Sequence, residues 1–166
     1  IAMSRKSREM KKKGIEVINL SLGEPDFNTP DHIKEAALRG MQENYTHYMA
    51  VNGYEDLREA IAYKFKRDNH LNYSTQQIVV STGAKQTLAN LFFSLINPGD
   101  EVILPAPYWV TYIEQIKMVQ GNPVVLPTTL ENSFKISPEQ LEKAISPKTR
   151  IFLLNSPSNP SGALYT

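Results

Sequence analysis

The sequence predicts an α/β protein in which helices lie on both faces of a mostly parallel sheet. Four short apolar runs, at residues 78–80, 102–104, 124–126 and 151–154, lack polar alternation, which is typical of strands buried on both faces. Segments with helical periodicity lie between these runs, and such alternation indicates βαβ units. The chain has 166 residues, of which 41% are hydrophobic, so it is long enough to bury a core.

Three helices are expected from apolar spacing in the first 96 residues. One begins near Pro30, with Thr29 as the expected N-cap, and a second begins after Gly53. The clearest periodicity lies in residues 84–96. The apolar residues of these helices that are expected to face a core are Ile33, Ala36, Ala37, Met41, Leu57, Ala60, Ile61, Phe65, Leu88, Leu91, Phe92, Leu95 and Ile96.

Two further helices are expected at residues 108–119 and 138–145. The second is preceded by Ser137 and carries Gln140 at the spacing of a capping box. The sequence Asn-Pro-Gly-Asp at residues 97–100 is a turn signal that separates the helix before it from the apolar run after it. These local signals predict where the elements begin and end.

The composition excludes several classes of function. Cysteine is absent, which excludes disulfide scaffolds, zinc ribbons, iron–sulfur clusters and cysteine nucleophiles. His32, His47 and His70 lack metal-ligand spacing, so no metal is expected. No apolar run approaches the ~18 residues of a membrane span, and the N-terminal residues lack the apolar core of a signal peptide. A cytoplasmic protein without a membrane partner is therefore expected.

Positive charge is concentrated at the start of the chain, where residues 1–13 hold six of the 18 basic residues. One interpretation is an arm that binds nucleic acid. The other is a solvated helix that leads into the domain. The second is favoured because the cluster is short and no aromatic residue is interleaved with the charges. No nucleic-acid partner is therefore expected.

Small, turn-forming and aromatic residues follow three of the apolar runs, at residues 81–86, 105–109 and 155–162. Because ligands bind beyond the carboxyl ends of strands in open α/β sheets, we expect these segments to converge. In the first segment, Gly83 and the free N–H groups of a helix start would accommodate a phosphate, and Lys85 adds positive charge. The alternative is an ordinary strand–helix turn.

Four other residues are each open to a functional and a structural interpretation. Trp109 is the only tryptophan, and it would stack on a flat aromatic ligand or pack a helix start against the sheet. Asn159 would hydrogen-bond a ligand oxygen or close its loop as an Asx-turn. Gly23 would offer its backbone to a carboxylate or end a strand, and Tyr48 would reach a phosphate or pack.

Six motifs occur together in a characteristic order. They are G-E-P-D-F at 23–27, Y-x-x-x-x-G at 48–53, S-T-G-A-K-Q at 81–86, P-G-D-E-V at 98–102, P-x-P-Y-W at 105–109 and S-N-P-S-G at 158–162. Over essentially the whole chain this pattern resembles the class I/II aminotransferases, which are fold-type I enzymes dependent on pyridoxal 5′-phosphate (PLP). It is most similar to the bacterial aspartate aminotransferase subgroup.

The resemblance implies a cofactor site built from five of these residues. Gly83, Ala84 and Lys85 match the backbone cradle that binds the phosphate of PLP. Trp109 matches the aromatic residue that stacks on the pyridine ring. Asn159 matches the asparagine that hydrogen-bonds the 3′ oxygen of the ring, which tunes the proton affinity of the cofactor. Both Trp109 and Asn159 also border the expected substrate position.

The resemblance further implies residues for substrate and partner. Gly23 matches the glycine whose backbone contacts the substrate α-carboxylate. Tyr48 matches a tyrosine that reaches the phosphate bound by the other subunit, so a homodimer is expected. Ser161 stands where the family commonly has threonine, a change that keeps the hydroxyl group.

The resemblance also implies that the catalytic residues lie outside this sequence. The Schiff-base lysine, the aspartate that pairs with the pyridine nitrogen and the arginine that clamps the substrate are all expected beyond Thr166 in family order. The chain is therefore expected to be a fragment, with an N-terminal arm and small-domain segment at residues 1–30 and the first half of the PLP-binding large domain at residues 31–166. No catalytic residue is expected within it, and it is expected to be inactive alone.

The expected reaction is transfer of an amino group from an amino acid, with aspartate as the natural donor, to a 2-oxo acid such as 2-oxoglutarate. One alternative is a different PLP reaction on the same fold, such as a lyase or a cyclopropane-carboxylate synthase-like activity. A second is a non-catalytic module, either the aminotransferase-like half of a transcription regulator or a degraded remnant. A third is an α/β nucleotide-binding protein.

Overall fold

The computed structural model describes residues 2–18 and 23–166. The chain separates into two compact units, Ile1–Tyr48 and Met49–Thr166, which are described one at a time. The predicted division at residue 30, between a small-domain segment and the first half of the large domain, stays a prediction. Within the described residues, no helix is long and apolar enough to cross a membrane.

The first unit contains two helices, α1 (Ala2–Lys12) and α2 (Asp31–Gln42). The basic segment forms the expected solvated helix, in which Arg5 and Glu9 make an ion pair of 3.3 Å on the exposed surface. α2 begins one residue later than expected. Pro30 itself is the N-cap residue, and its carbonyl accepts hydrogen bonds from the N–H groups of Ile33 and Lys34, so Thr29 does not cap the helix.

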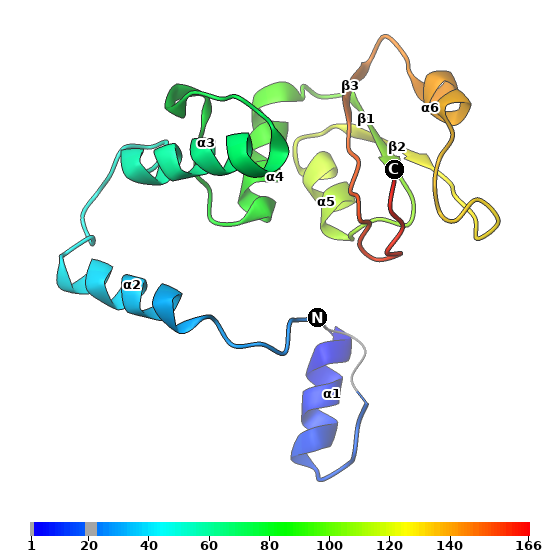
Figure 1. Ribbon diagram of the computed structural model, residues 1–166. Coiled ribbons are helices and arrows are strands. Elements are labelled where there is room, and N and C mark those ends of the chain that lie inside the picture. Colours follow the sequence, from blue (N-terminus) through cyan, green and yellow to red (C-terminus); the bar gives the residue numbers. More distant parts are fainter. Residues whose placement is uncertain (1, 19–22) are drawn as a thin grey trace. The chain divides into compact units, whose positions relative to one another are not determined.

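The second unit alternates helices and strands (Figure 1). Its elements are α3 (Glu55–Asn69), a 3₁₀ turn η1 (Thr75–Gln77), α4 (Ala84–Leu95), β1 (Glu101–Pro105), α5 (Thr111–Met118), β2 (Asn122–Leu126), α6 (Pro138–Ala144) and β3 (Thr149–Phe152). The capping box predicted before α6 is present, since the Ser137 hydroxyl accepts from the Gln140 N–H and the Gln140 side chain accepts from the Ser137 N–H.

The three strands form a parallel sheet in the order β2-β1-β3 (Figure 1). Ile103, at the centre of β1, pairs with Val124 on one side and with Phe152 on the other. Val102, Ile103 and Leu104 are buried, as expected for a central parallel strand. The predicted class, a parallel sheet with helices, is confirmed.

The core lies where α4 and α5 pack with β1. Its buried residues are Phe92, Ile96, Val102, Leu104, Ile116 and Val119. Because the two helices share this core with the central strand, the start of α4 and the segment between β1 and α5 are held by the most buried part of the molecule. Both of these segments were predicted to carry functional residues.

The apolar run at residues 78–80 was predicted to be a strand, and that prediction is wrong for this chain. The run follows η1 without entering the sheet, and the N–H of Val80 donates to the carbonyl of Asn52 at 3.1 Å. Ile78 is buried, but Val79 is 64% exposed. An apolar run becomes a strand only when another strand satisfies its backbone groups, and none of the strands of the sheet β2-β1-β3 pairs with residues 78–80.

Two of the predicted apolar faces are also less buried than expected. No residue of α2 is buried. On α3 the buried residue is Arg58, whereas Leu57 is 43% exposed. α4 does bury Phe92, and Ile96 just after the helix is buried as well, although Leu95 on the same stripe is 54% exposed. Helical spacing predicted the helices, but burial depends on a neighbouring element being present.

Candidate functional site

The turn before α4 has the backbone geometry that its sequence predicts. Gly83 is the N-cap residue and has φ +79°, a conformation in which a side chain would be strained. A Cβ built at Gly83 would meet no atom within 4 Å, so the backbone is open to approach by a ligand. The N–H of Thr82 donates to the Gln86 side chain, and this bond steadies the turn.

Two backbone donors at the start of α4 are left without a described acceptor. The carbonyl of Gly83 accepts from the N–H groups of Gln86 and Thr87. The N–H groups of Ala84 and Lys85 have no acceptor within the described part of the chain. The helix has no acidic residue in its first turn. Free N–H groups and the positive end of a 12-residue helix therefore form a place suited to an anion.

Trp109 lies close to this turn. It is half-buried between β1 and α5, and the ammonium group of Lys85 lies 5.3 Å from the centroid of its ring. The N–H of Tyr112 donates to the carbonyl of Trp109 at 3.0 Å, which ties the residue to the first turn of α5. The structure thus brings together two segments that the sequence predicted to converge.

A buried glutamine, which was not predicted from the sequence to be a site residue, also links these segments. Gln115 of α5 is 9% exposed, and its side-chain N–H donates to the carbonyl of Lys85 at 2.7 Å. The signal that could have revealed it is its place beside Ile116 and within the stripe of Tyr112 and Val119, because a polar residue on the buried side of an amphipathic helix needs a specific partner.

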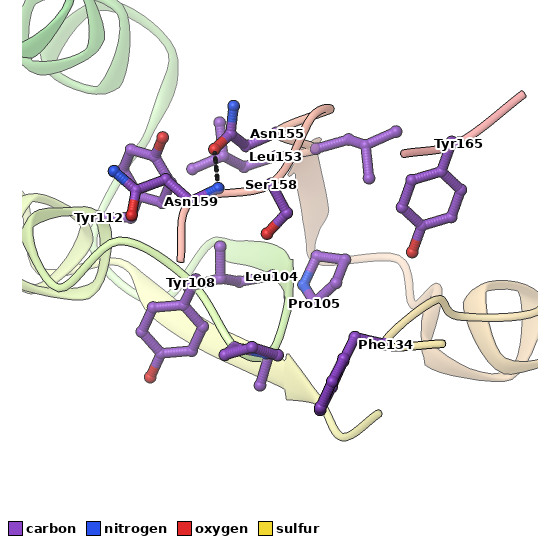
Figure 2. A pocket seen from close by; sticks show the side chains of 13 residues that line it. Leu104, Pro105, Tyr108, Tyr112, Phe134, Leu153, Asn155, Ser158, Asn159 and Tyr165 are labelled. Atoms are coloured by element: carbon purple, nitrogen blue, oxygen red, sulfur yellow. Dashed lines mark hydrogen bonds between the residues drawn. The ribbon is translucent and has the colours of Figure 1, made fainter. Parts of the chain in front are cut away.

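The loop after β3 holds Asn159 at the edge of a small hollow (Figure 2). The Asn155 side chain accepts from the N–H of Asn159 at 2.9 Å, so Asn155, and not Asn159, closes the loop. Asn159 is itself exposed, and its side-chain amide has no hydrogen bond to any described residue. Its amide group is therefore available to a ligand.

The hollow beside Asn159 lies at the carboxyl ends of β1 and β3. Its volume is about 20 Å³, room for roughly one water molecule. Its lining residues are Leu104, Pro105, Ala106, Pro107, Tyr108, Tyr112, Phe134, Leu153, Leu154, Asn155, Ser158, Asn159 and Tyr165. Gly83 and Ala84 line a separate open hollow beside α3. Asn159 therefore lines a hollow at the carboxyl ends of the strands together with Tyr108, the residue before Trp109. Gly83 lines a different hollow.

Gly23 and Tyr48 belong to the first unit and are both exposed. A Cβ at Gly23 would meet no atom within 4 Å. Their predicted roles, toward a substrate carboxylate and toward a phosphate held by another subunit, remain predictions.

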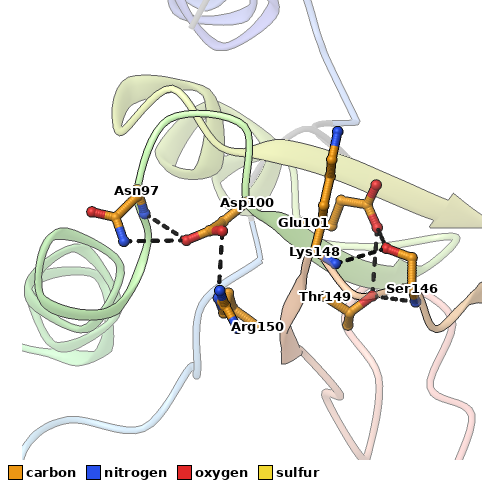
Figure 3. A network of polar contacts seen from close by, with 7 residues as sticks. All are labelled: Asn97, Asp100, Glu101, Ser146, Lys148, Thr149 and Arg150. Atoms are coloured by element: carbon orange, nitrogen blue, oxygen red, sulfur yellow. Dashed lines mark hydrogen bonds and ion pairs between the residues drawn. The ribbon is translucent and has the colours of Figure 1, made fainter.

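The opposite ends of β1 and β3 are joined by a polar network (Figure 3). Asp100 accepts from the backbone N–H of Asn97 at 2.9 Å and pairs with Arg150 at 3.4 Å. The Asn97 N–H, and to a smaller extent Arg150, lower the pKa of the Asp100 carboxyl group. Glu101 accepts a hydrogen bond from the hydroxyl of Ser146. These contacts hold the amino ends of the strands, while the carboxyl ends carry the candidate site.

Comparison with known proteins decides the family. The family model described as aminotransferase class I and II matches residues 15–166. The chain belongs to this family. A probable aspartate/prephenate aminotransferase of Rhizobium leguminosarum bv. phaseoli is 53% identical over the whole chain, and the aspartate aminotransferase of Bacillus subtilis (strain 168) is 51% identical. In both cases this chain spans 42% of the relative's length.

Solved structures give the same relationship. The aspartate aminotransferase from Rhizobium meliloti superposes with a TM-score of 0.94 at 45% identity, over 99% of this chain and 41% of that protein. The aspartate aminotransferase from Thermus thermophilus with maleate gives a TM-score of 0.96 at 42% identity, over 99% of this chain and 43% of that protein. The described fold is therefore that of the N-terminal two-fifths of these enzymes.

Proposed function

We propose that this chain forms the cofactor cradle of a PLP-dependent enzyme that transfers an amino group from an amino acid to a 2-oxo acid. The observation that carries the proposal is the pairing of two free backbone donors, at Ala84 and Lys85, with an indole ring whose centroid lies 5.3 Å from the Lys85 ammonium group. Family membership supports PLP as the cofactor.

The residues present fit such a group. The free N–H groups of Ala84 and Lys85 would hold its phosphate, and the lack of any atom near a Gly83 Cβ leaves room for the phosphate oxygens. The face of Trp109 would bind the flat ring. The exposed amide of Asn159 would donate to an oxygen on that ring. When bound, PLP supplies an electron sink for the substrate α-carbon.

These residues bind and orient, and none of them moves a proton in the proposed reaction. The helix dipole of α4 stabilises the phosphate dianion, and a hydrogen bond from Asn159 favours the ionised form of the ring oxygen. No lysine of this chain is assigned to covalent attachment of the cofactor, since Lys85 lies in the phosphate turn. The 166-residue chain alone is therefore proposed to be unable to transaminate.

The proposed substrates follow from the names of the relatives. Those named aspartate aminotransferase support aspartate as the amino donor, and 2-oxoglutarate is proposed as the acceptor on the resemblance alone. Those named aspartate/prephenate aminotransferase extend the candidate acceptors to prephenate, which is also a 2-oxo acid. Within the full-length enzyme, Gly23 would contact the substrate carboxylate, and Tyr48 would reach the phosphate of the partner in a homodimer.

The proposal is tested by removing one phosphate donor without breaking the helix. Ala84 is the first residue of α4, a position where proline is tolerated because its missing N–H has no helical acceptor. Ala84→Pro should weaken PLP binding by about tenfold or more, since a hydrogen bond to a charged group is worth about 1.5–3 kcal/mol. Binding is followed through the fluorescence of Trp109, the only tryptophan.

The matched control is Glu55→Pro, which places proline at the first residue of α3. It should leave PLP affinity unchanged. Pyridoxal, which lacks the phosphate, should bind wild type weakly. Its affinity should be the same for wild type and for both variants. If wild type binds PLP no more tightly than pyridoxal, the proposed phosphate site is wrong. If the chain alone converts aspartate and 2-oxoglutarate to products, the proposed inactivity of the chain is wrong.

A further inference from the structure

The two segments proposed to hold the cofactor lie at the start of α4 and just before α5, and a side-chain hydrogen bond joins these two helices. The Nε2 group of Gln115, in α5, donates to the carbonyl oxygen of Lys85, in α4, at 2.7 Å. The bond spans 30 positions of sequence. It ends on the residue whose own N–H is one of the two free donors of the phosphate turn, so it acts directly on the backbone of that turn.

The burial of Gln115 shows that its side chain is not there for packing alone. The residue is 9% exposed, and its Oε1 atom is buried without a partner among the described residues. A buried amide oxygen that makes no hydrogen bond is destabilising, and an apolar side chain of the same length would avoid that cost. What glutamine adds at this position is the N–H donor to Lys85.

The other end of the link is Trp109. The N–H of Tyr112 donates to the Trp109 carbonyl at 3.0 Å, and Tyr112 lies one helical turn before Gln115. The backbone of Trp109 is therefore tied to the first turn of the helix that carries the glutamine. The Lys85 ammonium group lies 5.3 Å from the centroid of the indole ring, so the backbone of Lys85 is bonded to α5 and its side chain lies beside the residue that precedes α5.

We propose that Gln115 is a positioning residue, which holds the phosphate turn of α4 at a fixed distance from Trp109. This inference rests on the proposed function, because the fixed distance matters only to a ligand whose phosphate and ring are covalently joined. Such a ligand binds tightly only when both subsites are held at the spacing of its two groups. Ligands that carry one group alone are indifferent to the spacing.

That difference defines the experiment. Gln115→Met keeps the length of the side chain and removes the donor, and Gln76→Met makes the same exchange at an exposed position of η1. The affinity of each chain is measured for PLP, for pyridoxal and for inorganic phosphate. Gln115→Met should lower the affinity for PLP by about fivefold, the effect of losing a hydrogen bond of average strength. The affinities for pyridoxal and for inorganic phosphate should be unchanged. Gln76→Met should change none of the three.

A second variant separates the lost donor from altered packing. Gln115→Glu retains the size and polarity of the side chain, and at a pH where its carboxyl group is ionised it cannot donate to the Lys85 carbonyl. It should weaken PLP binding at least as much as Gln115→Met. Circular dichroism confirms that each variant is folded. Equal losses for PLP, pyridoxal and phosphate would overturn the inference, because they would indicate general disruption of the unit.

A readout without cofactor keeps the inference independent of the proposed function. Because the chain has one tryptophan, its emission and its quenching by iodide report on Trp109 in the free protein. Gln115→Met should shift both, and Gln76→Met should shift neither. If wild type binds PLP no better than pyridoxal, the proposed function fails while the fluorescence result still decides whether Gln115 positions the indole. Unchanged fluorescence in Gln115→Met would overturn the positioning role.

Discussion

The helices α2 and α4 are both 12 residues long and both carry apolar residues at helical spacing, yet of the two only α4 buries any of them. Phe92 of α4 is 0% exposed, whereas Ile33 and Met41 of α2 are 49% and 62% exposed. An amphipathic pattern thus determines which face of a helix is apolar. Whether that face is buried depends on a second element that packs against it.

For α4 that element is present within the same unit. Its buried residues share a core with β1, with Ile116 of α5 and with Val119, which follows α5. The packing also fixes the start of α4, where the proposed phosphate donors lie. For α2 no buried residue is found. The following substitutions test how far this contrast extends.

The largest effect is expected from Phe92→Ala. It removes the buried centre of the α4 face and leaves a cavity, so the free energy of unfolding of the second unit should fall by about 3–5 kcal/mol. Urea denaturation followed by far-ultraviolet circular dichroism measures the loss. The neighbouring Phe93 is 63% exposed, and Phe93→Ala should cost less than about 1 kcal/mol. Equal losses would contradict the assignment of the buried face.

A loop position should show a smaller effect of the same kind. Gly53 is buried and has φ +96°, and a Cβ there would lie 2.8 Å from Cγ2 of Val80. Gly53→Ala should therefore destabilise the second unit by about 2–4 kcal/mol, through backbone strain and overpacking together. Gly14 also has positive φ but has no atom within 4 Å of its Cβ position, so Gly14→Ala should cost only about 1 kcal/mol. Thermal unfolding of both variants measures the difference.

A third test concerns the polar end of the sheet, where stability depends on charge. The pKa of Asp100 is lowered, chiefly by the backbone N–H of Asn97. A carboxyl group whose pKa is lower in the folded chain stabilises it above the ordinary pKa, and this contribution is lost as pH falls through the folded pKa. Asp100→Asn should therefore flatten the decline of stability below about pH 4.

The measurement is the free energy of unfolding across the acid range for wild type and Asp100→Asn. Glu59→Gln, at an exposed position of α3, controls for the loss of one negative charge. An acid decline in Asp100→Asn as steep as that of wild type would show that the Asn97 contact does not hold the carboxylate in solution.

The smallest effect is expected on α2. Met41→Gln replaces a side chain that is 62% exposed with one of similar length and helix propensity. The free energy of unfolding should change by less than about 0.5 kcal/mol. A loss above about 1 kcal/mol, measured by chemical denaturation, would mean that the apolar face of α2 is buried in solution and would remove the contrast with α4.

Much of the local structure was predictable from the residues because it depends on near neighbours. Gly83 before the apolar stripe of α4 predicted the start of that helix, and Ser137 with Gln140 predicted the capping box of α6. The strands β1 and β2 were predicted from continuous apolar residues, although β2 buries Leu126 and leaves Val125 40% exposed. The same local motifs, in order, identified the family that the comparisons then confirmed.

Amino-acid order alone therefore determined the class of fold, most helices and strands, and the segments that carry the candidate site. Tertiary structure alone decided that residues 78–80 stay outside the sheet, that Asn155 closes the loop that presents Asn159, and that Gln115 reaches the carbonyl of Lys85. The physical reason is the distance along the sequence between the residues that interact. Caps, turns and helical stripes are set by residues a few positions apart, whereas strand pairing, burial and side-chain bonds across 30 positions require the chain to be folded.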